Sequence, residues 1–225
     1  MAGSTMRRAW VPWRNSLISL VPGLHRAVVR TDFCLRHLPR LASQGWSAPL
    51  PPLLKRSFLR GIARDESAKV FVETGTYLGD TTWWFRNDYE KLYTVEVDPF
   101  LHEQARRRFS GSAKIEVFRG DSSSVLADIV PRVDRKALYW LDGHYSAGIT
   151  GSGVSHCPVI GELNAIYGHA KAPFVIVIDD ARCFGEDPAY PTVAAVQERI
   201  TALSHGRDAV AVENDMIVIR QPRGR

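Results

Sequence analysis

The clearest indication of the fold is the segment Lys69-Val-Phe-Val-Glu73, which is followed by Thr74-Gly-Thr-Tyr-Leu-Gly-Asp80. The first part is a short apolar run that ends in an acid, which predicts a buried β-strand. The second part carries two glycines just before a stretch that can be helical, residues 81–89. In sheets of alternating strands and helices, ligands bind beyond the carboxyl ends of the strands. The residues that follow each strand are therefore the candidates for a ligand-binding site.

The same alternation continues to the end of the chain. Apolar runs predict further strands, and segments with helical spacing or an early proline predict helices between them. The expected strands span residues 69–73, 91–97, 113–118, 137–141, 174–178, 209–212 and 216–219, and the expected helices span residues 81–89, 99–109, 122–130, 158–169 and 192–204. This order predicts an α/β fold with seven strands, helices on both faces of a parallel sheet, and an antiparallel hairpin at one edge.

Composition excludes several classes of protein. The chain has 225 residues, 45% of them hydrophobic, which is ordinary for a globular protein and excludes a disordered chain. Its three cysteines show no C-x-x-C spacing, so neither a disulfide framework nor a zinc ribbon is expected. No apolar run reaches the length of a membrane-spanning helix. A reducing, cytoplasmic location is expected from these features.

The positive charge is concentrated at the N-terminus. Residues 1–60 hold ten Lys and Arg but one acid, a net charge of +9, whereas the whole chain carries +5. We therefore expect residues 1–55 to form a basic, helical arm or lid with a proline-rich linker, and residues 56–225 to form the main domain. Trp and Leu side chains at helical spacing are interpreted first as packing on the main domain or as contact within a homodimer. The less favoured alternatives are contact with a partner or with a membrane surface, which would make the protein peripheral to the membrane.

Acids and glycines follow the first three strands. The loop Gly75–Gly79 lacks the G-x-G-x-x-G spacing of a pyrophosphate cradle, so a dinucleotide site is disfavoured. Glu96 lies 23 residues after Glu73, near the separation of about 20 at which an acid meets ribose hydroxyls. Asp121 can accept from the exocyclic amine of a purine, or it can cap the next helix. Tight packing of the glycines and a solvated strand end remain open as alternatives for the first two features.

Three more carboxylates follow the fourth and fifth strands, in Asp142-Gly-His144 and Asp179-Asp180. Carboxylates at adjacent strand ends repel one another unless a cation or protons neutralise them, and their oxygens suit Mg²⁺. His144 can take a proton near neutral pH. The alternative for the Asp pair is a helix cap with a salt bridge to Arg182. The Gly- and Ser-rich stretch 143–157 is expected to form a mobile lid over the site.

Together these motifs resemble the class I methyltransferases that depend on S-adenosylmethionine (SAM), over about residues 69–220. The likeness rests on Glu-Thr-Gly-Thr-Tyr-Leu-Gly from residue 73, Glu96, Gly-Asp-Ser from residue 120, and Asp-Gly-His-Tyr-Ser from residue 142. Within that class the chain is similar to the metal-dependent macrocin-type sugar O-methyltransferases. The resemblance implies a Rossmann-like methyltransferase sheet in the order 3-2-1-4-5-7-6.

The resemblance also implies roles for individual residues. Glu96 would hold the ribose of SAM, and Asp121 with Ser122 would meet the adenine. Asp142 and His144 would be catalytic, with a histidine where the macrocin-type family has an aspartate. Asp142, Asp179 and Asp180 would bind Mg²⁺. The full set expected at SAM is Glu73, Gly75, Thr76, Tyr77, Gly79, Asp80, Thr81, Glu96, Asp121, Ser122 and Asp142.

The expected function is therefore Mg²⁺-assisted O-methylation of a hydroxyl on a small molecule, sugar or glycoconjugate. A catalytically silent SAM-binding scaffold at a membrane assembly is one alternative. A nucleic-acid methyltransferase that uses the basic arm is another, although no Asn/Asp-Pro-Pro-Tyr-like motif follows the fourth strand. A nicotinamide dehydrogenase is disfavoured by the glycine spacing.

Overall fold

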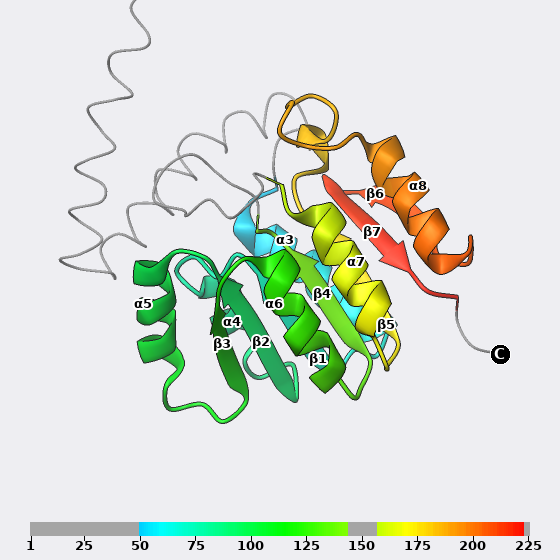
Figure 1. Cartoon of the computed structure of the whole chain (residues 1–225). Helices are drawn as coiled ribbons and strands as arrows, with labels where there is room; N and C mark the ends of the chain where they lie inside the picture. The colour runs from blue at the N-terminus through cyan, green and yellow to red at the C-terminus, as the bar shows by residue number, and fades with distance from the viewer. Residues whose placement is uncertain (1–49, 144–156, 223–225) are drawn as a thin grey trace, which may run out of the picture. The chain divides into compact units, whose positions relative to one another are not determined.

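Seven strands form one sheet in the part of the chain that this computed structural model describes, residues 50–143 and 157–222 (Figure 1). Their order is β3-β2-β1-β4-β5-β7-β6, as the resemblance implies. Strands β1 to β5 are parallel, and β7 runs antiparallel to both β5 and β6. The strands are β1 Val70–Thr74, β2 Lys91–Glu96, β3 Ile115–Arg119, β4 Ala137–Leu141, β5 Phe174–Ile178, β6 Ala209–Glu213 and β7 Met216–Arg220.

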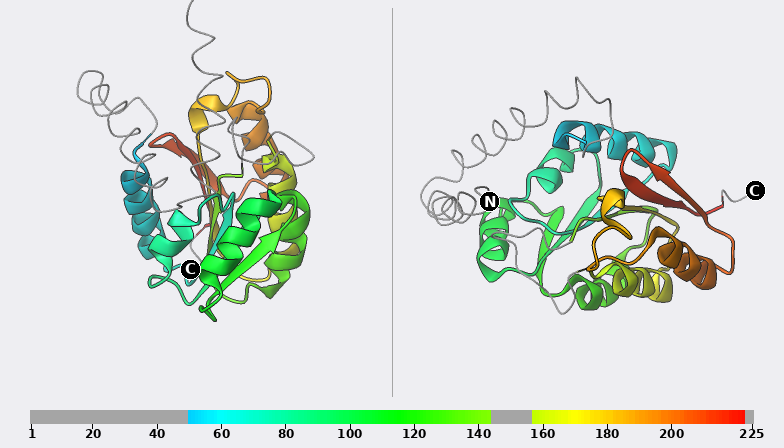
Figure 2. Two further views of the ribbon diagram at one scale, coloured as in Figure 1. Left: turned by 90° about the vertical axis from the view of Figure 1, so that its left-hand side faces the viewer. Right: turned by 90° about the horizontal axis from the view of Figure 1, so that it is seen from above.

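Helices cover both faces of this sheet. The α-helices of the described residues are α3 Pro52–Asp65, α4 Asp80–Phe85, α5 Pro99–Phe109, α6 Ser122–Ile129, α7 Val159–His169 and α8 Val193–Ser204, and the short 3₁₀ helices are η1 Val130–Arg132 and η2 Ala181–Cys183. Figure 2 shows α3 and α4 on one face and α6 and α7 on the other. The α/β class, the seven strands and the two helical layers predicted from the sequence are confirmed.

Strand β1 supplies the centre of the core because both of its faces are buried. Phe71 points toward α4, where its ring centroid lies 5.0 Å from that of Phe85 and 5.2 Å from that of Tyr89. Val70 and Val72 point the other way, into the apolar cluster formed with α6, α7 and α8. Alternate side chains of a strand face opposite sides of a sheet, so one five-residue run anchors both layers.

The helix after β1 is shorter than the expected 81–89 and ends at Phe85. The backbone N–H of Asp88 donates to the carbonyl of Phe85 at 2.9 Å and turns the chain. This turn lets Tyr89 reach the core, where only 3% of its surface is exposed. Packing of Tyr89 against Phe71 thus outweighs continued helix formation.

Helix α3 is an element that the sequence pattern did not predict, because the stretch before it is rich in proline. It buries Leu59 and Ile62 against the sheet, and the Arg60 guanidinium lies over the ring of Phe85 at 5.9 Å. The expected domain boundary at residue 55 falls inside this helix. The expected arm before residue 50 lies outside the described residues. No helix within the described ranges is both long and apolar enough to cross a bilayer.

Candidate active site at the carboxyl edge of the sheet

The parallel strands place the predicted site residues in one row. The residues that end β1, β4 and β5 are paired with one another in the strand register. The next residues, Gly75, Asp142 and Asp179, therefore follow one another across the carboxyl edge of the sheet. The N–H groups of Asp142 and Asp179 still donate to the neighbouring strand, at 3.2 and 3.1 Å. Glu96, the last residue of β2, lies beside Gly75 in the same row.

Gly75 is required by the close approach of two strand ends. Its φ is +84°, and a Cβ at this position would lie 2.4 Å from the backbone oxygen of Asp142. Any side chain would force the β1 and β4 loops apart. The tight packing considered as an alternative from the sequence is therefore present, and it leaves backbone rather than side chain at the centre of the row.

Gly79 has a related role where α4 begins. It is the N-cap residue of α4 with a φ of +71°, and a Cβ there would meet the Phe109 ring at 2.9 Å. Asp80 follows it and accepts from Arg108 at 2.8 Å. Thr81 lies in the same first turn. The start of α4 is thus held against α5, next to the row of strand ends.

Glu73 points into the core and not into the row. Its Oε2 accepts from the Thr82 hydroxyl at 2.6 Å and from the Thr94 hydroxyl at 2.9 Å. Burial raises the pKa of Glu73 to about 7, against the opposing effect of these two hydrogen bonds. The observed role of this carboxyl is to tie β1 to β2 and α4, and the expected contact with SAM stays a prediction.

Thr76 also lies beneath the loop and not on its outer surface. Its hydroxyl is buried and lies 2.5 Å from the hydroxyl of Thr94. The N–H groups of Gly75 and Thr76 both donate to the carbonyl of Val95. These bonds hold the loop backbone onto the end of β2.

Glu96 fixes the conformation of that loop. Its Oε2 accepts from the N–H of Tyr77 at 2.7 Å, and its Oε1 accepts from the N–H of Asp98 at 3.0 Å. Burial raises the pKa of Glu96, although both backbone bonds oppose the rise. Each carboxylate oxygen has about two acceptor positions, so both can still accept from a ligand hydroxyl.

Asp121 and Ser122 lie at the junction between β3 and α6. Asp121 occupies the N-cap position of α6, but its side chain forms no cap and accepts instead from the Ser123 hydroxyl. Ser122 is buried in the first turn. Asp121 therefore lies one strand beyond Glu96 on the same edge of the sheet, where an adenine-binding acid is expected.

The carboxylates after β4 and β5 surround a lysine that sequence reasoning did not assign to the site. Lys55 Nζ donates to Asp179 Oδ2 at 2.5 Å and to Asp180 Oδ1 at 3.2 Å. Arg182 donates to the same Asp180 oxygen at 2.9 Å, as the alternative prediction for this segment proposed. Asp142 is close enough for its charge to act on Lys55. The cluster thus holds three acids and two bases.

The pKa directions agree with this arrangement. Burial and then the charge of Asp179 raise the pKa of Asp142. Burial also raises the pKa of Asp179, with Lys55 opposing it, whereas Lys55 and Arg182 outweigh burial and lower that of Asp180. Burial alone would lower the pKa of Lys55, but the three carboxylates raise it above its ordinary value. Lys55 is therefore an ammonium cation.

The acidic cluster does not fit the expected Mg²⁺ site. The place of a metal ion beside Asp179 Oδ2 is taken by a cation, the Lys55 ammonium, and Asp179 Oδ1 accepts from the N–H of Asp180 at 2.8 Å. Within residues 50–143 and 157–222, no group of three or more His, Cys, Asp and Glu side chains is arranged to hold a metal ion. His144 and the expected lid over residues 144–156 lie outside the described residues, so their roles stay predictions.

A buried carboxyl below the row was missed by the sequence reasoning. Glu162 of α7 is fully buried, and its Oε1 lies 3.5 Å from where a Cβ on Gly143 would be. Burial raises the pKa of Glu162 to about 7, while the hydroxyls of Ser122 and Thr74 oppose the rise. An acid on the face of a helix that also carries Val159, Leu163 and Ile166 was the available signal, since that face packs on the core.

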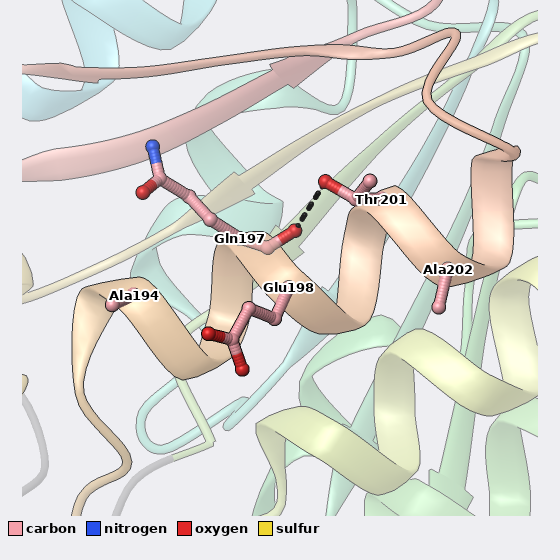
Figure 3. A pocket seen from close by; sticks show the side chains of 5 residues that line it. All are labelled: Ala194, Gln197, Glu198, Thr201 and Ala202. Atoms are coloured by element: carbon pink, nitrogen blue, oxygen red, sulfur yellow. Dashed lines mark hydrogen bonds between the residues drawn. The ribbon is translucent and has the colours of Figure 1, made fainter.

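A hollow elsewhere on the surface is separate from this row. Its lining comes from one helix, α8, and Figure 3 shows the side chains Ala194, Gln197, Glu198, Thr201 and Ala202. All five residues are exposed, and the Thr201 hydroxyl donates to the carbonyl of Gln197 at 2.8 Å. No strand end contributes to it, so it is not part of the candidate active site.

Solved methyltransferase structures share this architecture. An O-methyltransferase from Bacillus cereus in complex with SAH is 13% identical, with a TM-score of 0.54 over 94% of this chain and 97% of that chain. The O-methyltransferase TomG from Streptomyces achromogenes, in complex with SAM, is 17% identical, with a TM-score of 0.52 over 96% and 98%. The SAH-bound methyltransferase PaMTH1 from Podospora anserina is 16% identical, with a TM-score of 0.52 over 99% and 97%.

No protein-family model and no curated protein sequence matches this chain. At the identities found among the solved structures, the likeness establishes the fold. The chain therefore shares the fold of these methyltransferases, a seven-stranded mixed sheet in the order 3-2-1-4-5-7-6 with helices on both faces.

Proposed function

We propose that this chain is a SAM-dependent methyltransferase that methylates a hydroxyl oxygen. The observation that carries the proposal is the row at the carboxyl edge of the sheet, where a backbone-only position at Gly75 lies between Glu96 and Asp142. Structural neighbours with this fold are described as SAM- or SAH-bound O-methyltransferases. Fold alone does not define a reaction, so the proposal rests on the row and is tested on it.

The row suits a nucleoside with a methionine-like tail. Glu96 retains acceptor capacity for the two ribose hydroxyls, and Asp121 on the adjacent strand can accept from the adenine amine. The loop from Gly75 to Gly79 would pass beneath the methionine moiety without a side chain at its closest point. We thus keep the predicted cofactor set. Within it, Glu73 and Thr76 support the loop from beneath through their bonds to Thr82 and Thr94.

When bound, SAM supplies a methyl group on a sulfonium, which is transferred by in-line displacement. What this chain must add is alignment of the acceptor and removal of the hydroxyl proton. Asp142, directly after β4, is proposed to orient the acceptor, and His144 two residues later is the predicted base. The acceptor is proposed to be a small molecule such as a sugar or glycoconjugate, on the strength of the macrocin-type motif. The predicted Mg²⁺ assistance has to be weighed against Lys55, which pairs with two of the expected metal ligands, Asp179 and Asp180.

Cofactor binding is tested first, by thermal unfolding with S-adenosylhomocysteine and with NADH as control. A ligand at about 100 times its dissociation constant stabilises the folded state by roughly 2.7 kcal/mol. For a chain of this size that is a shift of roughly 5–10 °C. A shift with S-adenosylhomocysteine alone supports the proposal, and a shift with NADH alone, or with neither ligand, refutes it.

The role of Glu96 is tested with Glu96→Gln. Loss of charge-assisted hydrogen bonds to the ribose should weaken S-adenosylhomocysteine binding by about 10- to 100-fold, measured by calorimetry. Glu103→Gln is the matched control, because Glu103 is on the surface of α5 and pairs with Arg106 and Arg107. Equal affinities of both variants would remove Glu96 from the site.

The reaction is tested by incubating the protein with methyl-labelled SAM and a panel of hydroxylated acceptors, sugars included. Labelled product that survives mild base would be an ether, as O-methylation of a hydroxyl predicts. Cofactor binding without transfer to any acceptor would favour the silent scaffold. Label in RNA, lost on deletion of residues 1–49, which leaves α3 and Lys55 intact, would favour the nucleic-acid alternative.

The expected contacts of residues 1–55 with a membrane surface or a partner concern residues that are largely outside the described part of the chain. They stay proposals, as does the homodimer. Vesicle flotation of the full chain tests contact with a membrane surface, and light scattering tests the homodimer.

A further inference from the structure

Lys55 lies where the sequence pattern places a metal ion. Its ammonium is within hydrogen-bond distance of one oxygen of Asp179 and one of Asp180, at 2.5 and 3.2 Å. The contact is protected from water, since 16% of the Lys55 side chain and 3% of the Asp179 side chain are exposed. The attraction within a shielded ion pair of this kind is screened less by water and salt than that of a pair on the surface.

Helix α3 holds this lysine in place from outside the strand pattern. Leu59, Ile62 and Ala63 bury one side of the helix, and Arg60 pairs with Asp88 at 2.7 Å. At the far end, Lys136 donates to the buried carboxyl of Glu66 just after the helix, at 2.6 Å. The position of Lys55 therefore follows from a helix that is anchored from Leu59 to its C-terminal end, beginning one turn after Lys55.

The cluster already contains positive charge from the chain itself. Lys55 and Arg182 lie among the carboxylates of Asp142, Asp179 and Asp180, and Arg182 also pairs with Asp215. The repulsion that suggested a bound cation is thus relieved by side chains of the chain itself. Mg²⁺ binds oxygens at about 2.0–2.1 Å, so it cannot take Asp179 Oδ2 while the Lys55 ammonium is in contact with that oxygen.

We propose that Lys55 is the resident cation of the Asp142, Asp179 and Asp180 cluster and replaces the expected Mg²⁺, so that the reaction does not need a divalent metal. This inference rests on the proposed function for its catalytic meaning. Lys55 acts as a positioning residue in this proposal, because it holds Asp179 and Asp180 next to Asp142, the residue proposed to orient the acceptor.

The test compares wild type, Lys55→Met and Lys136→Met. Lys136→Met is the matched control, because it removes a lysine from a buried carboxyl away from the row. Mn²⁺ binding is followed by the EPR signal of the free ion, and the unfolding temperature is measured with Mg²⁺ and with EDTA. Wild type and Lys136→Met should bind Mn²⁺ equally weakly. The unfolding temperature of each protein should be the same in Mg²⁺ as in EDTA. Lys55→Met should bind Mn²⁺ about tenfold or more tightly, because its carboxylates have lost their cation.

Two results would overturn the proposal. One is a lower unfolding temperature of the wild type in EDTA than in Mg²⁺, together with tight Mn²⁺ binding. The other is a folded Lys55→Met variant with no gain in Mn²⁺ affinity. If Lys55→Met does not fold, Lys55→Gln, which keeps hydrogen-bond donors without the charge, takes its place, and the wild-type titration decides in any case.

Failure of this inference can be told apart from failure of the proposed function. Each sample is also titrated with S-adenosylhomocysteine. Absence of that response refutes the methyltransferase function, whereas the Mn²⁺ and EDTA responses report on Lys55 alone.

Discussion

Gly75 and Asp142 approach so closely that a Cβ on Gly75 would lie 2.4 Å from the Asp142 backbone oxygen. This approach brings the loop after β1 to the loop after β4, at the centre of the candidate site. The φ of +84° at Gly75 adds a conformational demand that other residues meet poorly. The site therefore depends on the absence of a side chain at residue 75.

Gly75→Ala should lower the free energy of unfolding by about 2–4 kcal/mol, from the strained φ and the clash together. It should also weaken S-adenosylhomocysteine binding, because the strand-end loops must move apart. Urea unfolding and calorimetry measure the two effects. The control is Gly61→Ala in α3, where a Cβ meets nothing within 4 Å and should stabilise the helix by about 0.5–1 kcal/mol. Equal stability of the two variants would contradict the argument.

Glu162→Gln should change how stability depends on pH. The pKa of Glu162 is raised to about 7 in the folded protein from an ordinary 4.5, so the folded state holds the proton more tightly. That stabilising effect is complete below about pH 4.5 and is lost as the pH rises through about 7. The free energy of unfolding falls by at most about 3 kcal/mol over this range, and the glutamine variant does not show this fall because its amide does not titrate.

Urea unfolding of wild type and Glu162→Gln at about pH 5 and about pH 8 measures this effect. The stability of the variant relative to wild type should be greater at the higher pH. Glu198→Gln, on the exposed face of α8, controls for the change in net charge. A difference between wild type and Glu162→Gln that is the same at both values would refute the prediction.

Asp98→Ala should destabilise α5 by about 0.5–2 kcal/mol, because Asp98 is its N-cap. The Asp98 side chain accepts from the N–H groups of Phe100 and Leu101, both at 2.9 Å. Asp98→Asn keeps an acceptor oxygen and should retain most of the stability. Thermal unfolding of the three proteins tests this, and an Asn variant as unstable as the Ala variant would show that the charge and not the cap matters.

Phe71→Ala should cost about 3–5 kcal/mol of stability, since it leaves a cavity where three aromatic rings pack. Phe100→Ala removes a similar side chain that is 51% exposed and should change stability by less than about 0.5 kcal/mol. Denaturant unfolding distinguishes the two. Comparable losses would mean that the aromatic cluster around Phe71 is not the centre of the core.

Much of the fold could be predicted because its signals are local. The strands Ala137–Leu141 and Phe174–Ile178 have the predicted bounds, since each is a five-residue apolar run between polar turns. Helix α5 also has its predicted bounds, because Asp98 and Pro99 define its start through a cap and a fixed φ. The bounds were less accurate at the helix after β1, where the tertiary packing of Tyr89 ends the helix early.

The candidate site could be predicted only as far as strand ends determine it. The register of parallel strands brings Gly75, Glu96, Asp142 and Asp179 to one edge, and the alternation of strands and helices was enough to expect this. The direction of each side chain was not predictable in the same way. The expected contact of Glu73 with the ligand stays a prediction, whereas its bonds to Thr82 and Thr94 could be seen only in the folded chain.

The α/β class, the seven strands and the row of acids could be predicted from local patterns, because periodicity and caps act between neighbours in the chain. What neutralises those acids is seen only in the folded chain. Lys55 and Asp179 are 124 residues apart in sequence, and their contact depends on how α3 packs on the sheet. Glu162 likewise lies below Gly143 because α7 packs against α6. Such contacts arise from the matching of buried surfaces, which no local pattern of residues encodes.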